Sequence, residues 1–122
     1  SLLVGGIGVM NTMYTAVLER TREIGVMKAV GAKNGQILGL FLTESGLLGL
    51  VGGAIGTLAG VWLSLLASRF ISRALEAPFV PSFNPELLIG AIAFSFVLGS
   101  ISGVLPARQA SRLQPVEALR YE

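Results

Sequence analysis

Three long stretches of the chain contain no charged residue, and they constrain the fold more than any other feature. They cover residues 1–18, 45–68 and 87–107, which are 18, 24 and 21 residues long. A helix needs about 20 apolar residues to cross a hydrocarbon core about 30 Å thick. The second and third stretches meet this length, and the first is at its lower limit. We therefore predict an all-α, polytopic membrane protein with spans at about 1–18, 40–68 and 86–105.

The composition supports a membrane domain and excludes several kinds of site. Apolar residues make up 52% of the chain and charged residues 13%, about half the charged share of a soluble domain. The chain has no Cys and no His, which excludes thiol catalysis, Cys/His zinc sites and a histidine general base. Its carboxylates are scattered, and a net charge of +2 makes nucleic acid a poor candidate partner. We predict no catalytic, cofactor-binding or metal-binding residue.

The first stretch does not resemble a signal peptide, because it lacks the charged start and the cleavage site. It also has no initiator Met. We therefore expect the chain to be a fragment that begins inside or just before a membrane helix.

Basic residues predict how the chain is oriented in the membrane. Segment 19–35 holds four Lys or Arg, the tail 106–122 holds three, and the connection 69–85 holds two. Three spans place the first segment and the tail on the same side, and loops rich in Lys and Arg stay in the cytoplasm. We predict a multi-pass protein of the cell (inner or cytoplasmic) membrane, with a cytoplasmic C-terminus and an extracytoplasmic 69–85.

Local sequence signals predict several helix boundaries. The sequence "NPE" at 84–86 places an Asn at an N-cap, Pro at the first helical position and Glu near the positive end of the dipole. The sequence "GAKNG" at 31–35 predicts a break, since Gly and Asn tolerate positive φ. Pro106 should end or kink the third span. Pro115 predicts the start of a short tail helix.

Small residues recur every four positions along the second and third spans. They are Gly52, Gly56, Gly60, Ser64 and Ser68, the parallel pair Gly49 and Gly53, and Ser95, Gly99 and Gly103. Such faces allow close helix contact in lipid. Glycine is also simply frequent in membrane helices. We favour a helix-packing seam, within the subunit or in a dimer, because four spacings in register are hard to reach by drift.

Glu44 lies at the edge of the second span. An ionisable residue at membrane depth indicates a functional site. Alternatively, Glu44 lies at the interface and pairs with a loop Arg or Lys. We favour the second interpretation, since the charge-free sequence begins only after this residue.

The charge-dense segment "ERTREIGVMKAVGAKN" at 19–34 is the best candidate for function. It suits a helix through Gly25, with charges for an aqueous surface. Near one face fall Val17, Thr21, Ile24 and Lys28. Apolar side chains that could fill a partner's groove are Ile24, Val26, Met27 and Val30. A membrane-surface helix anchored by basic residues is the alternative. The acidic residues favour a protein partner, because anionic lipid would repel them.

The sequence resembles the FtsX-like permease domain of ABC transporters, of the macrolide-exporter type, with lipoprotein-release permeases as relatives. The resemblance rests on "GGIGVMNTMYTAVLERTREIGVMKAVGAKNGQIL" at 5–38 and "LPARQASRLQPVEALRYE" at 105–122. It covers essentially the whole chain. It implies a membrane permease subunit that corresponds to the last three of four helices, without the first helix and the outer domain.

The resemblance also implies partners. The family works as a dimer driven by ATPase domains, which are fused to the permease or separate and hold ATP and Mg²⁺. The permease would transmit force across the membrane to the outer domain. The ATPase would dock on the cytoplasmic coupling segment, which maps onto Glu19, Arg20, Thr21, Arg22, Glu23, Ile24, Gly25, Lys28, Gly31 and Ala32. The chain itself would not hydrolyse ATP.

Two other functions stay open. Some relatives use the same motion to regulate extracytoplasmic cell-wall hydrolases instead of exporting a substrate. A membrane scaffold or channel without an ATPase is the third alternative, and we rank it last because only scattered Ser, Thr and Glu44 could line a path.

Overall fold

The computed structural model describes residues 1–75 and 81–114, and the described residues form five helices. These are α1 (Leu2–Glu19), α2 (Thr21–Ala29), α3 (Asn34–Leu75), α4 (Pro85–Ser102) and α5 (Val104–Arg112). No strand occurs within these two ranges, so the predicted all-α class is confirmed. Pro115 and the predicted tail helix lie outside the described residues.

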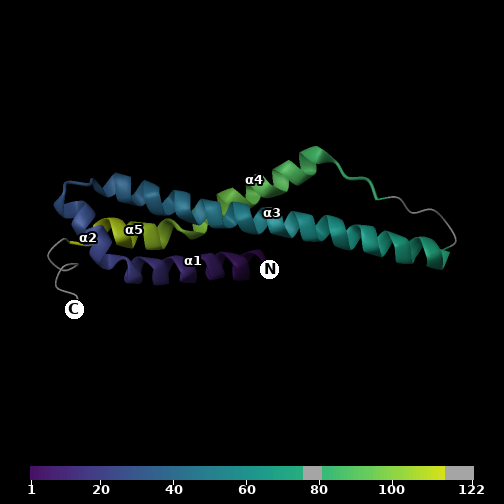
Figure 1. The fold of residues 1–122 in the computed structure, drawn as a ribbon, viewed down its shortest axis with the longest axis horizontal. Helices are drawn as coiled ribbons and strands as arrows, with labels where there is room; N and C mark the ends of the chain where they lie inside the picture. Colours follow the sequence, from purple (N-terminus) through teal and green to yellow (C-terminus); the bar gives the residue numbers. More distant parts are fainter. Residues whose placement is uncertain (76–80, 115–122) are drawn as a thin grey trace.

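Three helices are long and apolar enough to cross a membrane: α1, most of α3, and α4. They match the three predicted spans in number and order. The helix α3 has 42 residues, which corresponds to about 63 Å at 1.5 Å per residue. It therefore extends beyond a hydrocarbon core of about 30 Å. Figure 1 shows α3 as the long axis of the molecule, with α1 and α5 along one half of it. The membrane boundaries within these helices remain predictions.

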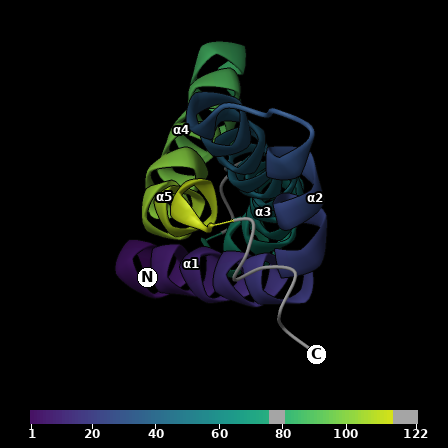
Figure 2. The same ribbon diagram turned by 90° about the vertical axis from the view of Figure 1, so that its left-hand side faces the viewer.

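The helical backbone is interrupted at Arg20, between α1 and α2, where this residue has φ −99° and ψ 14°. The Thr21 hydroxyl donates hydrogen bonds to the carbonyl oxygens of Val17 and Leu18, both at 2.9 Å. Such back-bonding bends helices. The prediction of an uninterrupted helix through this segment is therefore wrong, and Figure 2 shows α2 turned away from the direction of α1.

Gly31 ends α2 with φ +106°, as the predicted break at 31–35 requires. The amide of Ala32 donates to the carbonyl of Met27 at 2.9 Å, and the amide of Gly31 donates to the carbonyl of Lys28 at 3.0 Å. These two bonds form a Schellman motif, which satisfies carbonyls left free at the helix end.

The third apolar stretch forms two helices joined at Gly103 instead of one. Pro106 lies in the first turn of α5 and has no amide hydrogen to continue the helical ladder, so the predicted kink is confirmed. At the other end of α4, the Asn84 side chain accepts a hydrogen bond from the amide of Glu86 at 3.0 Å, and Pro85 is the first helical residue. The predicted N-cap is confirmed as well.

The apolar core lies at the end of the molecule that carries α2. Its buried members come from α1, α2, the start of α3 and α5, and they are Met13, Val17, Ile24, Ile37, Phe41, Ala107 and Ala110. In Figure 1 the end of α5 lies beside α2 at this same end. The segment 19–35 and the last described residues thus lie together, which is the arrangement that three membrane crossings require.

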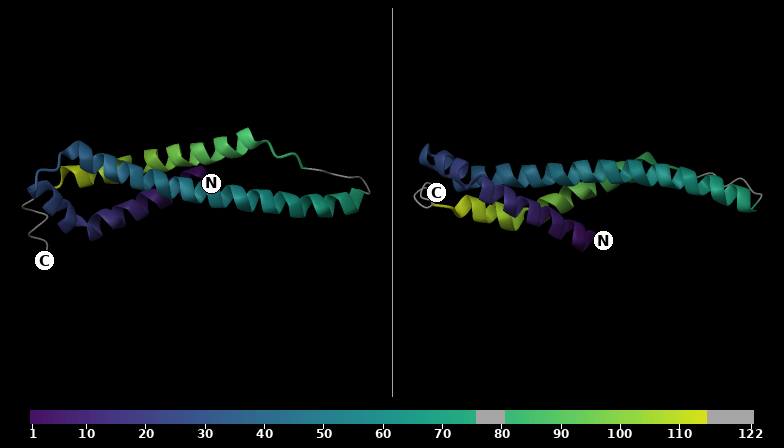
Figure 3. Two further views of the ribbon diagram at one scale, coloured as in Figure 1. Left: turned by 45° about the horizontal axis from the view of Figure 1, so that its top comes forward. Right: turned by 60° about the horizontal axis from the view of Figure 1, so that its bottom comes forward.

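At the opposite end α3 runs on past its neighbours. Both views in Figure 3 place the N-terminal end of α1 near the middle of α3, while α3 continues beyond it. Exposed large apolar side chains on this part of α3 include Leu58, Trp62 and Leu63. An apolar exposed surface of this extent fits a lipid environment, since few soluble monomers show large apolar patches.

Candidate functional site

The charged segment forms a short helix with one face held by the fold and the other exposed. On the inner face of α2, Ile24 is completely buried and Gly25 is buried beside it. Arg22, Glu23 and Val26 are exposed, and Val30, which follows α2, is 85% exposed. The core therefore fixes which residues of this segment remain accessible to a partner.

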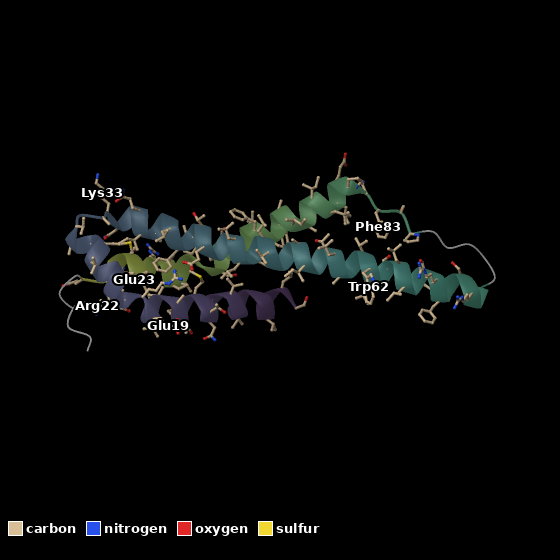
Figure 4. All side chains as sticks on the ribbon, viewed as in Figure 1. Glu19, Arg22, Glu23, Lys33, Trp62 and Phe83 are labelled. Atoms are coloured by element: carbon tan, nitrogen blue, oxygen red, sulfur yellow. The ribbon has the colours of Figure 1, made fainter. Side chains whose placement is uncertain are left out.

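The exposed residues of this segment fall on a common face. Arg22, Val26 and Val30 follow one another at four-residue steps, which brings them into line along a helix. Glu23 lies in the first turn of α2, where a carboxylate is favoured by the helix dipole. Figure 4 shows Glu19, Arg22, Glu23 and Lys33 at the same end of the molecule, with Lys33 pointing outward. We call Arg22, Glu23, Val26 and Val30 the α2 face.

Other candidate coupling residues are arranged differently. Glu19 is exposed, Thr21 is half-buried, and Gly31 and Ala32 form the Schellman turn. Ile24 lies inside the chain's own core, so the prediction that it could fill a partner's groove is wrong. Met27 packs against the same core. The less exposed of these residues hold and shape the segment, and they are Thr21, Ile24, Met27 and Ala32. Glu19 and Gly31 belong to its accessible surface.

An ion pair joins the break between α1 and α2 to the helix α3. The Arg20 Nη1 lies 3.2 Å from Oε1 of Glu44 and donates to both carboxylate oxygens, the second at 3.4 Å. The side chains are 51% and 33% exposed. Of the two alternatives for Glu44, the structure shows the pairing with a loop arginine.

A second polar contact joins α2 to the end of α5. The Nζ of Lys28 donates a hydrogen bond of 2.6 Å to the backbone carbonyl of Ser111. This carbonyl belongs to the last turn of α5, where backbone oxygens lack helical partners. The contact spans 83 positions of sequence. The segment is thus fastened both to α3 and to α5.

The small-residue stripe divides into two parts, one covered by α4 and one open. A Cβ on Gly49 would collide with the backbone of Ser95, and one on Gly53 would lie 2.5 Å from the Ser95 Cβ. A Cβ on Gly103 would collide with the Ser45 side chain. These glycines, with Gly99, let α3 and α4 cross in close contact, so this part of the predicted seam lies within the subunit.

The other half of the stripe faces open space. Apart from the neighbouring backbone of α3, no atom of the described residues lies within 4 Å of a Cβ position at Gly52, Gly56 or Gly60. With Ser64, they line a groove of about 720 Å³ between α3, α4 and the start of α1. No described residue fills the space beside these glycines, because α4 diverges from α3 beyond Gly53. Their packing at a dimer interface stays a prediction.

The described residues contain no group of three or more metal-ligating side chains. Hydroxyls within the long helices, such as those of Thr57, Ser95 and Ser100, donate to the carbonyl four residues earlier. Back-bonding satisfies these groups inside an apolar environment. The chemistry available here is therefore that of packing and of ion pairs at helix ends.

This architecture is that of a helical membrane domain with a charged segment between two of its membrane-spanning helices. A family model described as "FtsX-like permease C-terminal" matches residues 1–115. The chain belongs to the FtsX-like permease family.

Several relatives are similar over the whole chain. An uncharacterized ABC transporter permease of Methanocaldococcus jannaschii is 42% identical, and the permease YknZ of Bacillus subtilis is 48% identical. The macrolide export ATP-binding/permease protein MacB of Chromobacterium violaceum is 47% identical. Each alignment covers 100% of this chain and 31%, 29% and 18% of the respective relative. The chain therefore spans less than a third of each of these proteins.

Proposed function

We propose that this chain is the membrane domain of an ABC transporter permease, and that the α2 face receives an ATPase. The observation that carries the proposal is the division of α2 into an anchored face and an exposed face. Ile24 and Lys28 tie the helix to the core and to α5, while Arg22, Glu23, Val26 and Val30 remain accessible. A partner bound to the exposed face can therefore move α2, and the anchored face transmits this movement to the helices that α2 contacts.

The α2 face fits a protein groove better than a lipid surface. Two valines at a four-residue spacing supply an apolar ridge, and Arg22 and Glu23 place both signs of charge beside it. Amphipathic helices bind protein grooves through such i, i+4 anchors. An anionic membrane attracts basic helices but repels carboxylates. Val30 at 85% exposure is an apolar side chain for which an ATPase groove would provide burial.

The proposal extends to the assembly and its location. ATP and Mg²⁺ would be held by the ATPase, either a separate partner or a fused domain; the MacB relative is named as an ATP-binding and permease protein in one chain. Two permease subunits would form the working dimer in the cell membrane, surrounded by lipid, with the α2 end and the C-terminus in the cytoplasm. Support for this side comes from the basic residues of 19–35 and from the proximity of α5 to α2.

The proposed substrate follows from the sequence similarity of this chain to named relatives. Relatives that carry the name macrolide export protein are 44–47% identical to this chain, so we propose export of a macrolide-like or lipoprotein-type substrate. Expression of the full-length protein with its ATPase in a macrolide-sensitive host should raise macrolide resistance. Unchanged sensitivity, with ATPase activity intact, would speak for another substrate or for a regulator of the FtsX type.

The docking role can be tested by exchanging charges on the α2 face. The full-length permease with Arg22→Glu and Glu23→Arg should still insert into the membrane but lose co-purification of its ATPase and stimulation of ATP hydrolysis. The matched control is Arg69→Glu, which inverts an exposed charge at the far end of α3. Normal ATPase binding by the double variant would exclude docking through this face.

A further inference from the structure

Arg20 differs from the other charged residues of its segment, because its side chain forms an ion pair with a carboxylate of α3. Its guanidinium donates to both carboxylate oxygens of Glu44, at 3.2 and 3.4 Å. For Glu19, Arg22, Glu23 and Lys33, the structure of the described residues shows no ion pair. Arg20 also forms the break between α1 and α2, so it lies where the direction of the chain changes.

Glu44 is adjacent in sequence to Ser45, which lies where α3 and α4 cross. The next residue, Ser45, is fully buried. A Cβ on Gly99 of α4 would lie 2.6 Å from the Ser45 carbonyl oxygen, and the Ser45 side chain fills the space beside Gly103. A displacement of Glu44 therefore moves a residue packed against α4 at its junction with α5.

On the other side of this crossing, α3 and α4 separate. Gly53 is still in contact with Ser95, whereas Gly56 and Gly60 have open space beside them and line the groove. Figure 1 shows the two helices diverging away from the α2 end. Two helices that touch at a crossing can change their separation on one side of it when they are displaced on the other side.

We propose that Arg20 is a positioning residue, and that its ion pair with Glu44 is the link by which a movement of α2 reaches the α3–α4 crossing. The inference rests on the proposed docking of an ATPase on α2. Lys28 provides a second link, from α2 to the end of α5, so that α2 bridges both helices on this side of the crossing. Docking is assigned to the α2 face, and transmission to Arg20 and Glu44.

A role in transmission can be separated from a role in stability. Ion pairs that are this exposed contribute little to folding. Substitution of either partner should therefore leave the fold and the docking face in place. It should change only how strongly the two parts move together, and residues in a coupling network typically alter coupling by about 2- to 30-fold.

The experiment uses the full-length permease assembled with its ATPase in lipid nanodiscs. For Arg20→Ala and for Glu44→Ala, we expect normal ATPase affinity and normal thermal stability. The stimulation of ATP hydrolysis by the permease should fall by about 2- to 30-fold. The exchanged pair, Arg20→Glu with Glu44→Arg, should recover most of the stimulation. Arg69→Ala is the matched control, since it removes an exposed charge of α3 far from the coupling segment.

Each result decides between the two proposals. Full stimulation in both alanine variants would overturn the link, and so would failure of the exchanged pair to exceed the single variants. Loss of ATPase affinity in Arg20→Ala but not in Glu44→Ala would show that Arg20 is a docking residue, which also overturns it. Normal ATPase binding by the Arg22→Glu, Glu23→Arg variant would refute the proposed docking face instead, whatever the behaviour of Arg20.

Discussion

Gly49 of α3 and Gly99 of α4 meet backbone to backbone. A Cβ on Gly99 would lie 2.9 Å from the Cα of Gly49 and 2.6 Å from the carbonyl oxygen of Ser45. Favourable contacts between carbon atoms are about 3.5–4.0 Å long, so even one methyl group at this position must push the helices apart. The crossing of α3 and α4 therefore depends on the absence of side chains at two positions.

The first prediction concerns this contact. Gly99→Ala should lower the free energy of unfolding by about 1–3 kcal/mol, the usual cost of adding a methylene group to a well-packed site. The opposing atoms belong to backbone, which cannot rotate away as a flexible side chain could. The measurement is reversible unfolding of the purified protein in detergent micelles, followed by circular dichroism.

Gly56→Ala is the matched control on the same stripe of α3, because no described residue outside its own helical turn lies within 4 Å of its Cβ position. Its stability should equal that of the parent or exceed it slightly, since alanine is the better helix former. Equal stability of both variants would contradict the close crossing. If Gly56→Ala impairs assembly of the full-length protein, the open half of the stripe contacts another helix there.

The second prediction concerns the turn after α2. Gly31 has φ +106°, and left-handed backbone costs an L-residue about 1–2 kcal/mol. Gly31→Ala should be destabilised by this amount, and Gly31→Asn by less, because Asn tolerates positive φ better. Gly35→Ala is the control, since Gly35 is exposed in the first turn of α3 with space for a Cβ. Equal unfolding midpoints for the two alanine variants would be incompatible with the Schellman turn.

Local signals in the sequence predicted much of the fold correctly. Charge-free length predicted three membrane-spanning helices, "NPE" at 84–86 predicted an N-cap, and Gly31 and Pro106 predicted breaks. Each of these depends on residues close together in the chain, so local physics decides the outcome. The break at Arg20 was missed because Thr21 is an ordinary residue in helices, and its back-bonding to Val17 appears only in three dimensions.

Features that depend on distant contacts were predicted only in part. The four-residue spacing indicated a packing face but not its extent, since the divergence of α4 from α3 decides that Gly49 is covered and Gly56 open. An arginine or lysine partner for Glu44 was one of two alternatives, and no local pattern pointed to Arg20 in particular. The bond from Lys28 to Ser111 joins residues 83 positions apart, and no pattern in the sequence reveals it.

The third prediction concerns the start of α4. The side chain of Asn84 accepts a hydrogen bond from the amide of Glu86 at 3.0 Å. Asn84→Ala should lower stability by about 0.5–2 kcal/mol, as is usual when an N-cap is removed. Hydrogen exchange measured by mass spectrometry should show faster exchange in the first turn of α4. Asn84→Asp keeps an acceptor and should retain the protection of the parent, and loss of protection in this variant would argue against capping.

The fourth prediction concerns the tie between α2 and α5. The ammonium group of Lys28 donates to the carbonyl of Ser111 at 2.6 Å, and Lys28 is half-buried. Hydrogen bonds to charged groups contribute about 1.5–3 kcal/mol, and partial exposure reduces this to about 1 kcal/mol. In Lys28→Met the carbon stem is largely kept while the donor is lost. The variant should therefore be slightly less stable, with faster hydrogen exchange in the last turn of α5.

Lys33→Met is the control for this prediction, because Lys33 points outward (Figure 4) and forms no described ion pair. Unchanged exchange in α5 of Lys28→Met would mean that α2 is held to this helix by apolar packing around Ile24 alone.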